Sequence, residues 1–327
     1  MQIYGKNVLI TGGQGFLGKQ LATRFKRGGG IVFALDHSQY DLTQREAVEL
    51  AFSDIKPDIV IHAAGFLGGI HFSRLYPADV FLKNLQMACH IFEMANKYKI
   101  LKLVNIGSAC VYSDQLEGPF REEDMLALPM HSSVQYYGFS KLALYFGGRA
   151  FREQFGLNSI HLIPANLYGP GDKFDPEVSH VVSSMIPKFY DAMRTDKSEV
   201  VCWGSGNTVR EFLYVEDCAE AVFRATEIYD EPEPLNIGSG DGITMRALAE
   251  LIAKTTGFKG MTVWDTEKPD GAAYKVIDSS RARNLLKWSP STSFEVGMMN
   301  TVKWFSEYYE KWLALHKNEN TNGNIKT

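Results

Sequence analysis

The sequence predicts an α/β protein with a doubly wound parallel sheet, followed by a smaller mixed α/β domain towards its C-terminus. Short apolar runs alternate with segments of helical period over the first part of the chain, which is typical of parallel strands joined by crossover helices. A glycine-rich turn connects the first apolar run to the first helical segment. Beyond about residue 170 the alternation weakens and short mixed segments replace it, which indicates the second domain.

The first strand is expected at residues 8–10, and the apolar residues that follow it have helical spacing: Leu17, Leu21 and Phe25. The turn between strand and helix contains Gly12, Gly15 and Gly18. These glycines allow a tight turn, close approach of a pyrophosphate and close packing of the helix, whose N-terminus then faces the phosphates. A second strand at residues 31–35 ends at Asp36, which completes the context of a dinucleotide-binding Rossmann domain.

Asp36 indicates which dinucleotide is bound. A carboxylate at the end of the second strand can accept hydrogen bonds from both ribose hydroxyls but repels a 2′-phosphate, and no arginine follows it directly. The sequence therefore favours NAD as the cofactor, with NADP as the second possibility. A third strand, at residues 58–61, leads into small residues that suit a position beneath the nucleotide. We expect further cofactor contacts from Phe16, Leu17, Asp41, Leu42, Ala63, Ala64 and Gly65.

A fourth strand, at residues 103–106, precedes a candidate acid/base centre. Ser108 and Cys110 follow the strand directly, and Tyr137 and Lys141 come later with the spacing that puts two side chains on one helix face. A phenol has a pKa of about 10, and a neighbouring ammonium favours the phenolate. With the Ser108 hydroxyl to orient the reacting oxygen, these groups predict a centre that moves a hydride on or off a carbinol.

Two helices, about residues 80–97 and 137–155, carry apolar side chains on two faces. One face of each is expected to cover the sheet. The other face predicts a homodimer contact, although both faces could instead lie in the interior. The predicted dinucleotide-binding domain is residues 1–169 plus about 212–237. The second domain is about 170–211 plus 238–315, and residues 316–327 form a polar tail.

Composition limits the partners and the compartment. The chain has 327 residues and a net charge of −4, which suggests neither nucleic acid nor an anionic membrane as a partner. No apolar run reaches the roughly 18 residues of a membrane span, and the N-terminus leads directly into a strand without room for a signal peptide. The four cysteines lack metal-site spacing, so no metal site is predicted and a reducing cytoplasm is the simplest location.

The chain resembles the extended short-chain dehydrogenase/reductase family over roughly residues 6–310. The glycine turn, Asp36, Ser108, Tyr137 and Lys141 carry this resemblance, together with the segments 166–170 (NLYGP) and 210–212 (REF). The resemblance implies a nicotinamide dinucleotide in the N-terminal domain and a nucleotide-sugar in the C-terminal one. It also implies that Tyr137 is the acid/base, that Lys141 supports it, and that Ser108 bonds the sugar oxygen. Asn166 and His180 are expected to contact the cofactor.

Within that family the chain resembles the GDP-L-fucose synthase branch. The resemblance rests on residues 68–71 (GGIH), Cys110 after Ser108, His180 after the NLYGP segment, and residues 268–271 (KPDG). It implies 3,5-epimerisation and 4-reduction of a GDP-4-keto-6-deoxy-hexose. A C4 ketone acidifies the protons at C3 and C5, so Cys110 would remove one and His180 would return one to the opposite face. The expected substrate contacts are Lys188, Trp203, Arg210 and Asp270.

Some residues depart from that branch and keep two alternatives open. Asp36 disfavours NADPH, Gly13-Gln14 stands where the branch commonly has His-Arg or His-Lys, and Lys188 stands where it often has arginine. These departures allow an NAD-dependent 4-dehydrogenase or C4-epimerase of a related nucleotide-sugar, such as a GDP-manno-heptose. The other alternative is a non-catalytic binding protein on the same fold. A 4,6-dehydratase is less favoured, because Ala109 and Cys110 occupy the positions where that class needs an acidic pair.

Overall fold

The structure is a computed structural model that describes residues 1–127, 129–175, 179–268 and 270–316. Most of the expected polar tail therefore lies outside the described residues, as does Pro269 of the KPDG segment. No helix in the described part of the chain is both long enough and apolar enough to cross a membrane.

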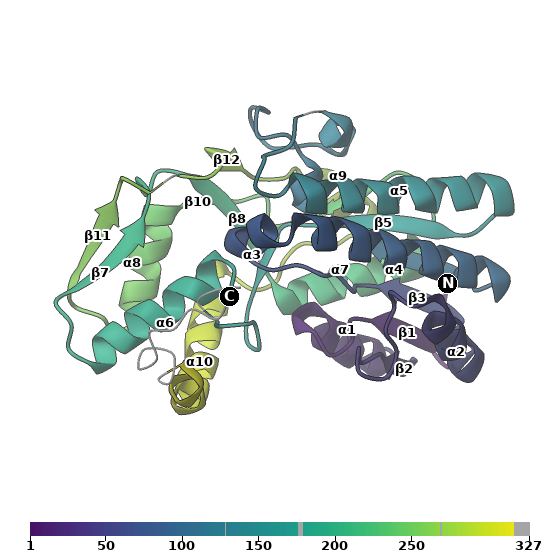
Figure 1. Cartoon of the computed structure of the whole chain (residues 1–327), viewed down its shortest axis with the longest axis horizontal. Helices are drawn as coiled ribbons and strands as arrows, with labels where there is room; N and C mark the ends of the chain where they lie inside the picture. Colours follow the sequence, from purple (N-terminus) through teal and green to yellow (C-terminus); the bar gives the residue numbers. More distant parts are fainter. Residues whose placement is uncertain (128, 176–178, 269, 317–327) are drawn as a thin grey trace.

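A six-stranded, fully parallel sheet forms the larger part of the molecule and confirms the predicted fold class (Figure 1). Its strand order is β2-β1-β3-β4-β5-β9. The strands are β1 (Asn7–Thr11), β2 (Ile31–Ala34), β3 (Ile59–His62), β4 (Lys102–Ile106), β5 (Ser159–Pro164) and β9 (Leu235–Ile237). Strands β3, β4 and β5 are buried along their whole length, which explains why they read as continuous apolar runs rather than alternating ones.

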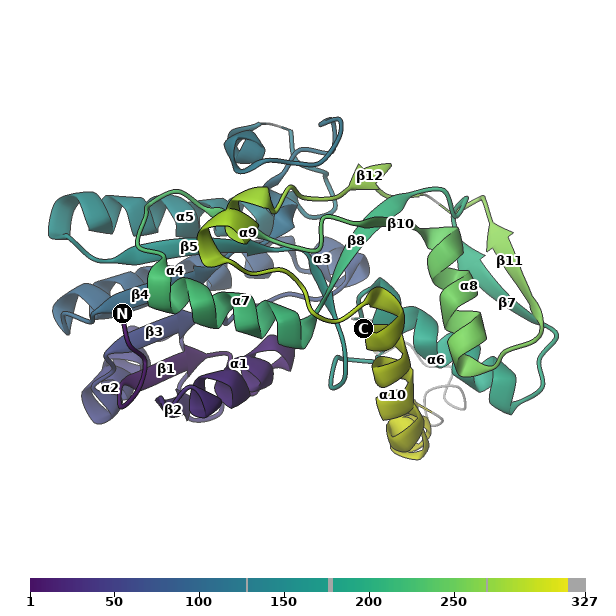
Figure 2. The same ribbon diagram turned by 180° about the vertical axis from the view of Figure 1, so that it is seen from behind.

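Helices cover both faces of this sheet (Figures 1 and 2). Along β1, Val8 and Ile10 join one hydrophobic cluster while Leu9 joins another, because successive side chains point to opposite faces. The first cluster includes side chains of α1 (Phe16–Arg27), α7 (Val215–Ile228) and α9 (Ser280–Leu286). The second includes side chains of α2 (Arg45–Ile55), α4 (Pro77–Lys97) and α5 (Gln135–Phe155).

The connection order creates a topological switch point beside β1. This strand pairs with β2 on one side and with β3 on the other, so the chain reverses its direction of winding there. Ligands of open parallel sheets bind in the crevice at the carboxyl ends of strands flanking such a point. The glycine turn after β1 and the short helix α3 (Ile70–Leu75) after β3 both lie at this edge of the sheet.

A second group of elements builds its own core at the other end of the molecule (Figure 1). A mixed sheet contains β10 (Gly242–Thr244), β8 (Val209–Tyr214), β12 (Tyr274–Lys275) and β6 (Asn166–Tyr168), and a parallel pair joins β7 (Glu199–Trp203) to β11 (Met261–Asp265). The helices are α6 (Val181–Arg194), α8 (Met245–Thr256) and α10 (Phe294–His316). Residues 166–168 and 212–214 pair within this sheet, so the small sheet extends into segments that the predicted boundaries assign to the first domain.

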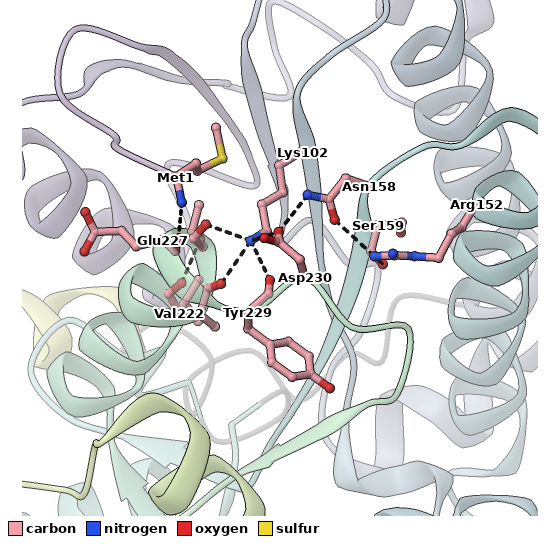
Figure 3. Close-up of polar contacts among 11 residues, drawn as sticks. Met1, Lys102, Arg152, Asn158, Ser159, Val222, Glu227, Tyr229 and Asp230 are labelled. Carbon is pink, nitrogen blue, oxygen red and sulfur yellow. Dashed lines mark hydrogen bonds and ion pairs between the residues drawn. The ribbon is translucent and has the colours of Figure 1, made fainter.

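Lys102, at the start of β4, is buried in a polar network that ties the large sheet to the end of α7 (Figure 3). Its ammonium donates to the backbone oxygens of Ala225, Thr226 and Tyr229 and to the carboxylate of Asp230. A lysine here satisfies the carbonyls that a helix leaves open at its C-terminus, and it complements the negative end of the helix dipole.

Candidate active site

The glycine turn has room for backbone only. Gly12 has a φ of +64°, and a Cβ there would come within 2.9 Å of Ala64 Cα. A Cβ on Gly18 would approach the Gly12 carbonyl oxygen to 2.0 Å. Gly15 caps the N-terminus of α1 without a side-chain hydrogen bond from the described residues, so the first backbone N–H groups of the helix remain available. This turn fits the pyrophosphate of a dinucleotide.

Asp36 follows β2 and is held by Ser38. Its Oδ1 atom accepts hydrogen bonds from the Ser38 backbone N–H at 2.8 Å and from the Ser38 hydroxyl at 2.9 Å. These hydrogen bonds lower the pKa of Asp36, so the carboxylate is charged at neutral pH. Asp41 is held in the same way by Thr43, at 3.0 Å from the backbone N–H. A negative charge at this position fits ribose hydroxyls and opposes a 2′-phosphate.

The loop after β3 is fixed by a buried amide. The Asn84 side chain, from α4, accepts from the Phe66 N–H at 3.0 Å and donates to the Phe66 carbonyl oxygen at 2.9 Å. Ala64 donates its N–H to Thr11 Oγ1 at 3.1 Å. Ala63, Ala64 and Gly65 are thereby held at the switch point. Asn84 was not predicted from the sequence, although an asparagine within a largely apolar helix segment was a usable signal.

Four of the predicted catalytic residues lie together where β4 meets α5. Ser108 and Cys110 belong to the tight turn after β4, and Ser108 Oγ accepts from the Cys110 N–H at 3.2 Å. Tyr137 and Lys141 come from α5, with Lys141 Nζ 5.5 Å from the centre of the Tyr137 ring. Gly138 allows α5 to pack closely against the turn that carries Cys110, since a Cβ at this position would lie 2.6 Å from the Cys110 carbonyl oxygen.

Burial dominates the electrostatics of this group. It raises the pKa of Tyr137, and the charge of Cys110 adds to that effect. It lowers the pKa of Lys141 to about 8, against the opposing influence of Cys110, while Lys141 Nζ donates to the Ile106 carbonyl oxygen at 2.9 Å. The expectation from the sequence rested on the Lys141 ammonium alone, which favours the phenolate. With burial included, Tyr137 is a protonated phenol at neutral pH, as a proton donor to a ketone oxygen must be.

Two buried histidines stand near Lys141 without adding charge. Burial and the Lys141 ammonium lower the pKa of His62 and of His161 to about 3, so both rings are neutral at physiological pH. His62 Nδ1 lies 2.9 Å from Thr11 Oγ1. Because both rings are neutral, they add no positive charge to that of the Lys141 ammonium next to the Tyr137 ring.

His180 is the predicted catalytic residue that lies apart from the other four. It is exposed at the N-cap of α6, and no hydrogen bond in the described part of the chain joins it to Ser108, Cys110 or Tyr137. The nearby Asp172 is partly buried and accepts a hydrogen bond from the Ser183 hydroxyl in the first turn of α6. Burial raises the pKa of Asp172 while the charge of His180 opposes that rise, which indicates that the two side chains are electrostatic neighbours.

The predicted substrate residues form two adjacent groups. Trp203 is 68% exposed, and Lys188 Nζ and Lys268 Nζ lie 5.7 Å and 5.9 Å from its ring centre. An exposed ring beside two ammonium groups can bind a planar or an anionic ligand. Arg210 and Asp270 form the other group: burial lowers the pKa of Arg210 while the Asp270 carboxylate opposes that change.

Lys275 was not selected from the sequence. It lies in the two-residue strand β12, where it pairs in register with Arg210 of β8. Its Nζ atom is 3.8 Å from Cys110 Sγ, although 165 positions separate the two residues in the chain. No local pattern in the sequence indicates this contact.

Comparison with known proteins identifies the family. The sequence profile of the NAD dependent epimerase/dehydratase family matches residues 8–238. The chain is 37% identical to GDP-L-fucose synthase 1 of Arabidopsis thaliana, over 91% of this chain and 92% of that protein. It is 32% identical to the GDP-L-fucose synthase of Escherichia coli strain K12, over 94% and 98% of the two chains.

A solved structure also supports the relationship to GDP-L-fucose synthases. The crystal structure of a GDP-L-fucose synthetase from Naegleria fowleri bound to NADP is 29% identical and has a TM-score of 0.87, covering 94% of this chain and 96% of that one. Family profile, sequence relatives and fold all cover the elements that carry the glycine turn and the Tyr137–Lys141 pair. The chain belongs to the NAD dependent epimerase/dehydratase family of enzymes.

Proposed function

We propose that the protein is a GDP-sugar epimerase/reductase of the GDP-L-fucose synthase type, acting on a GDP-4-keto-6-deoxy-hexose. The observation that carries this proposal is the placement of Cys110 beside Tyr137 at the end of β4. A simple reductase needs one proton donor at the reacting oxygen, whereas this site has a phenol and a thiol together. The second group is what epimerisation at the carbons next to a ketone requires.

The chain's own residues would hold a nicotinamide dinucleotide, which supplies the hydride for C4 when it is bound. The pyrophosphate would lie on the turn formed by Gly12, Gly15 and Gly18. We propose NAD as the preferred form, because the Asp36 carboxylate is charged and held by Ser38. NADP is the form named in the Naegleria fowleri structure, and it remains the alternative.

Epimerisation would use Cys110 and His180 on opposite faces of the sugar. The Cys110 thiolate removes a proton from C3 or C5, and the electron pair delocalises onto the C4 oxygen. His180 then delivers a proton to the other face. His180 is exposed at the N-cap of α6, which belongs to the second group of elements.

Reduction would use the residues of β4 and α5. Tyr137 donates its phenolic proton to the C4 oxygen, and the adjacent Lys141 ammonium stabilises the phenolate that forms. Ser108 accepts from a backbone N–H and, as a hydroxyl, can also donate to the same substrate oxygen. Lys188, Trp203, Arg210 and Asp270 would bind the GDP moiety and the sugar.

The alternative is an NAD-dependent 4-dehydrogenase or C4-epimerase of a related nucleotide-sugar, such as a GDP-manno-heptose. The charged Asp36 favours it, since such enzymes recycle NAD. Denaturing the purified protein and analysing the released nucleotides by mass spectrometry separates the two. Stoichiometric NAD or NADH supports recycling, whereas an empty protein that consumes NADH or NADPH with the 4-keto substrate supports the reductase.

Deuterium exchange in D₂O tests the main proposal. Wild-type protein should exchange the C3 and C5 hydrogens of the GDP-4-keto-6-deoxy sugar, and Cys110→Ser should lose this exchange by about 100-fold or more, because it loses the proton-abstracting group. The readout is isotope incorporation by NMR and mass spectrometry.

Tyr137→Phe is the matched control. It should retain the exchange and lose the reduction of the C4 ketone. Full exchange by Cys110→Ser would refute the epimerase assignment. Unimpaired turnover by both variants would favour a non-catalytic binding protein.

We further propose a homodimer through α4 and α5 and a cytoplasmic location. The two helices pack on each other, and their outer faces carry exposed apolar side chains, which is unusual for a surface without a partner: Phe81, Leu82, Tyr136, Phe139, Phe146 and Phe155. All four cysteines are free thiols, which supports a reducing compartment.

A further inference from the structure

The contact between Lys275 and Cys110 is built by elements distant in sequence. Strand β12, which carries Lys275, is parallel to β8. The chain beyond it is tied down as well, since Phe120 donates its N–H to the Val276 carbonyl oxygen at 2.9 Å and accepts from Asp278 N–H at 2.8 Å. The backbone that carries Lys275 is therefore anchored, and its side chain places Nζ 3.8 Å from Cys110 Sγ.

Cys110 faces three titratable groups on the elements packed around it. Tyr137 and Lys141 come from α5, and both respond to the charge of Cys110. Lys275 comes from β12. Tyr137 is neutral, and the Lys141 ammonium is directed at the Ile106 carbonyl oxygen. Among the described residues, Lys275 is the cation in direct contact with the sulfur.

The contact matters because a cation interacts more strongly with the thiolate form of a cysteine than with the neutral thiol. A cation within about 4 Å favours the thiolate and is typically worth a factor of about ten or more in the ratio of charged to neutral form. Thiolate, not thiol, is the reactive base and nucleophile.

We propose that Lys275 is a positioning residue for epimerisation, which holds Cys110 as the thiolate that removes the substrate proton. This inference rests on the proposed function of Cys110. In the step itself the C–H bond at C3 or C5 breaks and an S–H bond forms. The electron pair left on carbon delocalises to the C4 oxygen as an enolate, so no oxidant is required. The ammonium of Lys275 keeps its charge throughout.

The charge in contact with Cys110 thus belongs to the group of elements that also carries Arg210 and Trp203. The contact between Lys275 and Cys110 requires that β12 be packed against the turn after β4. Lys275 therefore links the assembly of the substrate-binding side to the reactivity of a residue on the dinucleotide-binding side.

Alkylation by iodoacetamide tests the inference without catalysis. Cys110 modification is followed by peptide mass spectrometry in wild type, Lys275→Met, Lys275→Gln and Lys275→Arg. The amount of protein is normalised to a cysteine-free peptide of the same digest in every sample. At pH 7 both neutral variants should alkylate Cys110 about tenfold more slowly than wild type, and Lys275→Arg should restore most of the rate.

The pH profile separates charge from structure. The neutral variants should approach the wild-type alkylation rate at alkaline pH, where hydroxide removes the thiol proton without assistance. Equal Cys110 rates in wild type and both neutral variants at pH 7 would overturn the proposal. So would a slow rate that neither alkaline pH nor arginine restores, because that pattern indicates a structural defect.

Deuterium exchange with the same variants keeps this inference separate from the proposed function. If wild type exchanges C3 and C5 hydrogens, Lys275→Met should slow that exchange about tenfold and should retain the reduction of the C4 ketone, in which Tyr137 donates the proton. If wild type shows no exchange, the epimerase function fails, and alkylation still decides whether Lys275 controls the Cys110 thiolate.

Discussion

Asp36 is a single residue that carries much of the cofactor proposal. Its carboxylate is exposed enough to meet a ribose, and two hydrogen bonds from Ser38 keep it ionised and oriented. The Naegleria fowleri structure holds NADP, whereas Asp36 favours NAD in this chain, so the choice of cofactor rests on Asp36 itself. The physical argument concerns charge: a fixed carboxylate gains hydrogen bonds from two hydroxyls and is repelled by a phosphate.

Replacing Asp36 with alanine should therefore shift the preference towards NADP. We expect the ratio of NADP to NAD affinity to rise by about tenfold or more, because the variant loses both the ribose contacts and the repulsion. Isothermal titration with each oxidised cofactor measures the ratio. Glu46→Ala removes an exposed charge from the first turn of α2 and should leave the ratio unchanged. An unaltered ratio in Asp36→Ala would show that another group selects the cofactor.

At the scale of elements, α7 and β4 depend on each other through Lys102. The Lys102 side chain is 0% exposed while that of Asp230 is 58% exposed, so the ammonium is buried mainly against carbonyl oxygens rather than in a closed ion pair (Figure 3). Burial lowers the pKa of Lys102, and hydrogen bonding with Asp230 counteracts it. The lysine thereby provides the hydrogen bonds that the C-terminus of α7 lacks within the helix.

Lys102→Met should destabilise the protein by about 2–4 kcal/mol, because the apolar side chain leaves buried carbonyls at the end of α7 without donors. Urea unfolding followed by circular dichroism gives the free energy of unfolding. Asp230→Asn is the comparison: its side chain is exposed, and it should change the stability by less than about 1 kcal/mol. Equal stabilities for Lys102→Met and wild type would mean that water replaces the ammonium at this helix end.

For the whole molecule, the proposed site lies where two hydrophobic cores meet. The turn after β4 contributes Ser108 and Cys110, and α5 contributes Tyr137 and Lys141. The smaller group of elements contributes Lys275 and the substrate residues. The pair α4 and α5 lies on the outside of the large sheet, with one face in the core and the other exposed (Figures 1 and 2). An exposed apolar face of two adjacent helices is the geometry that a second copy of the chain can bury.

Phe146→Glu should disrupt the proposed dimer, since Phe146 is 47% exposed on α5 and a charge there would be buried against the partner. We expect the dimer dissociation constant to rise at least about tenfold, measured by analytical ultracentrifugation over a range of concentrations. Leu285→Glu, at a residue of similar exposure on α9, should leave the assembly unaffected. A wild-type protein that sediments as a monomer throughout would exclude this interface.

Local sequence patterns were enough to predict the fold class, which the structure confirms, and to select the glycine turn with Asp36 and the set Ser108, Tyr137 and Lys141. These depend on local spacing: a period of 3.6 puts Tyr137 and Lys141 on one helix face, and apolar runs identify buried parallel strands. The folded arrangement was needed to show that Lys275 contacts Cys110, that Lys102 donates to the carbonyl oxygens at the end of α7, and that burial keeps Tyr137 protonated. These features depend on which distant segments pack together and how much solvent they exclude, and neither quantity is encoded in a local pattern.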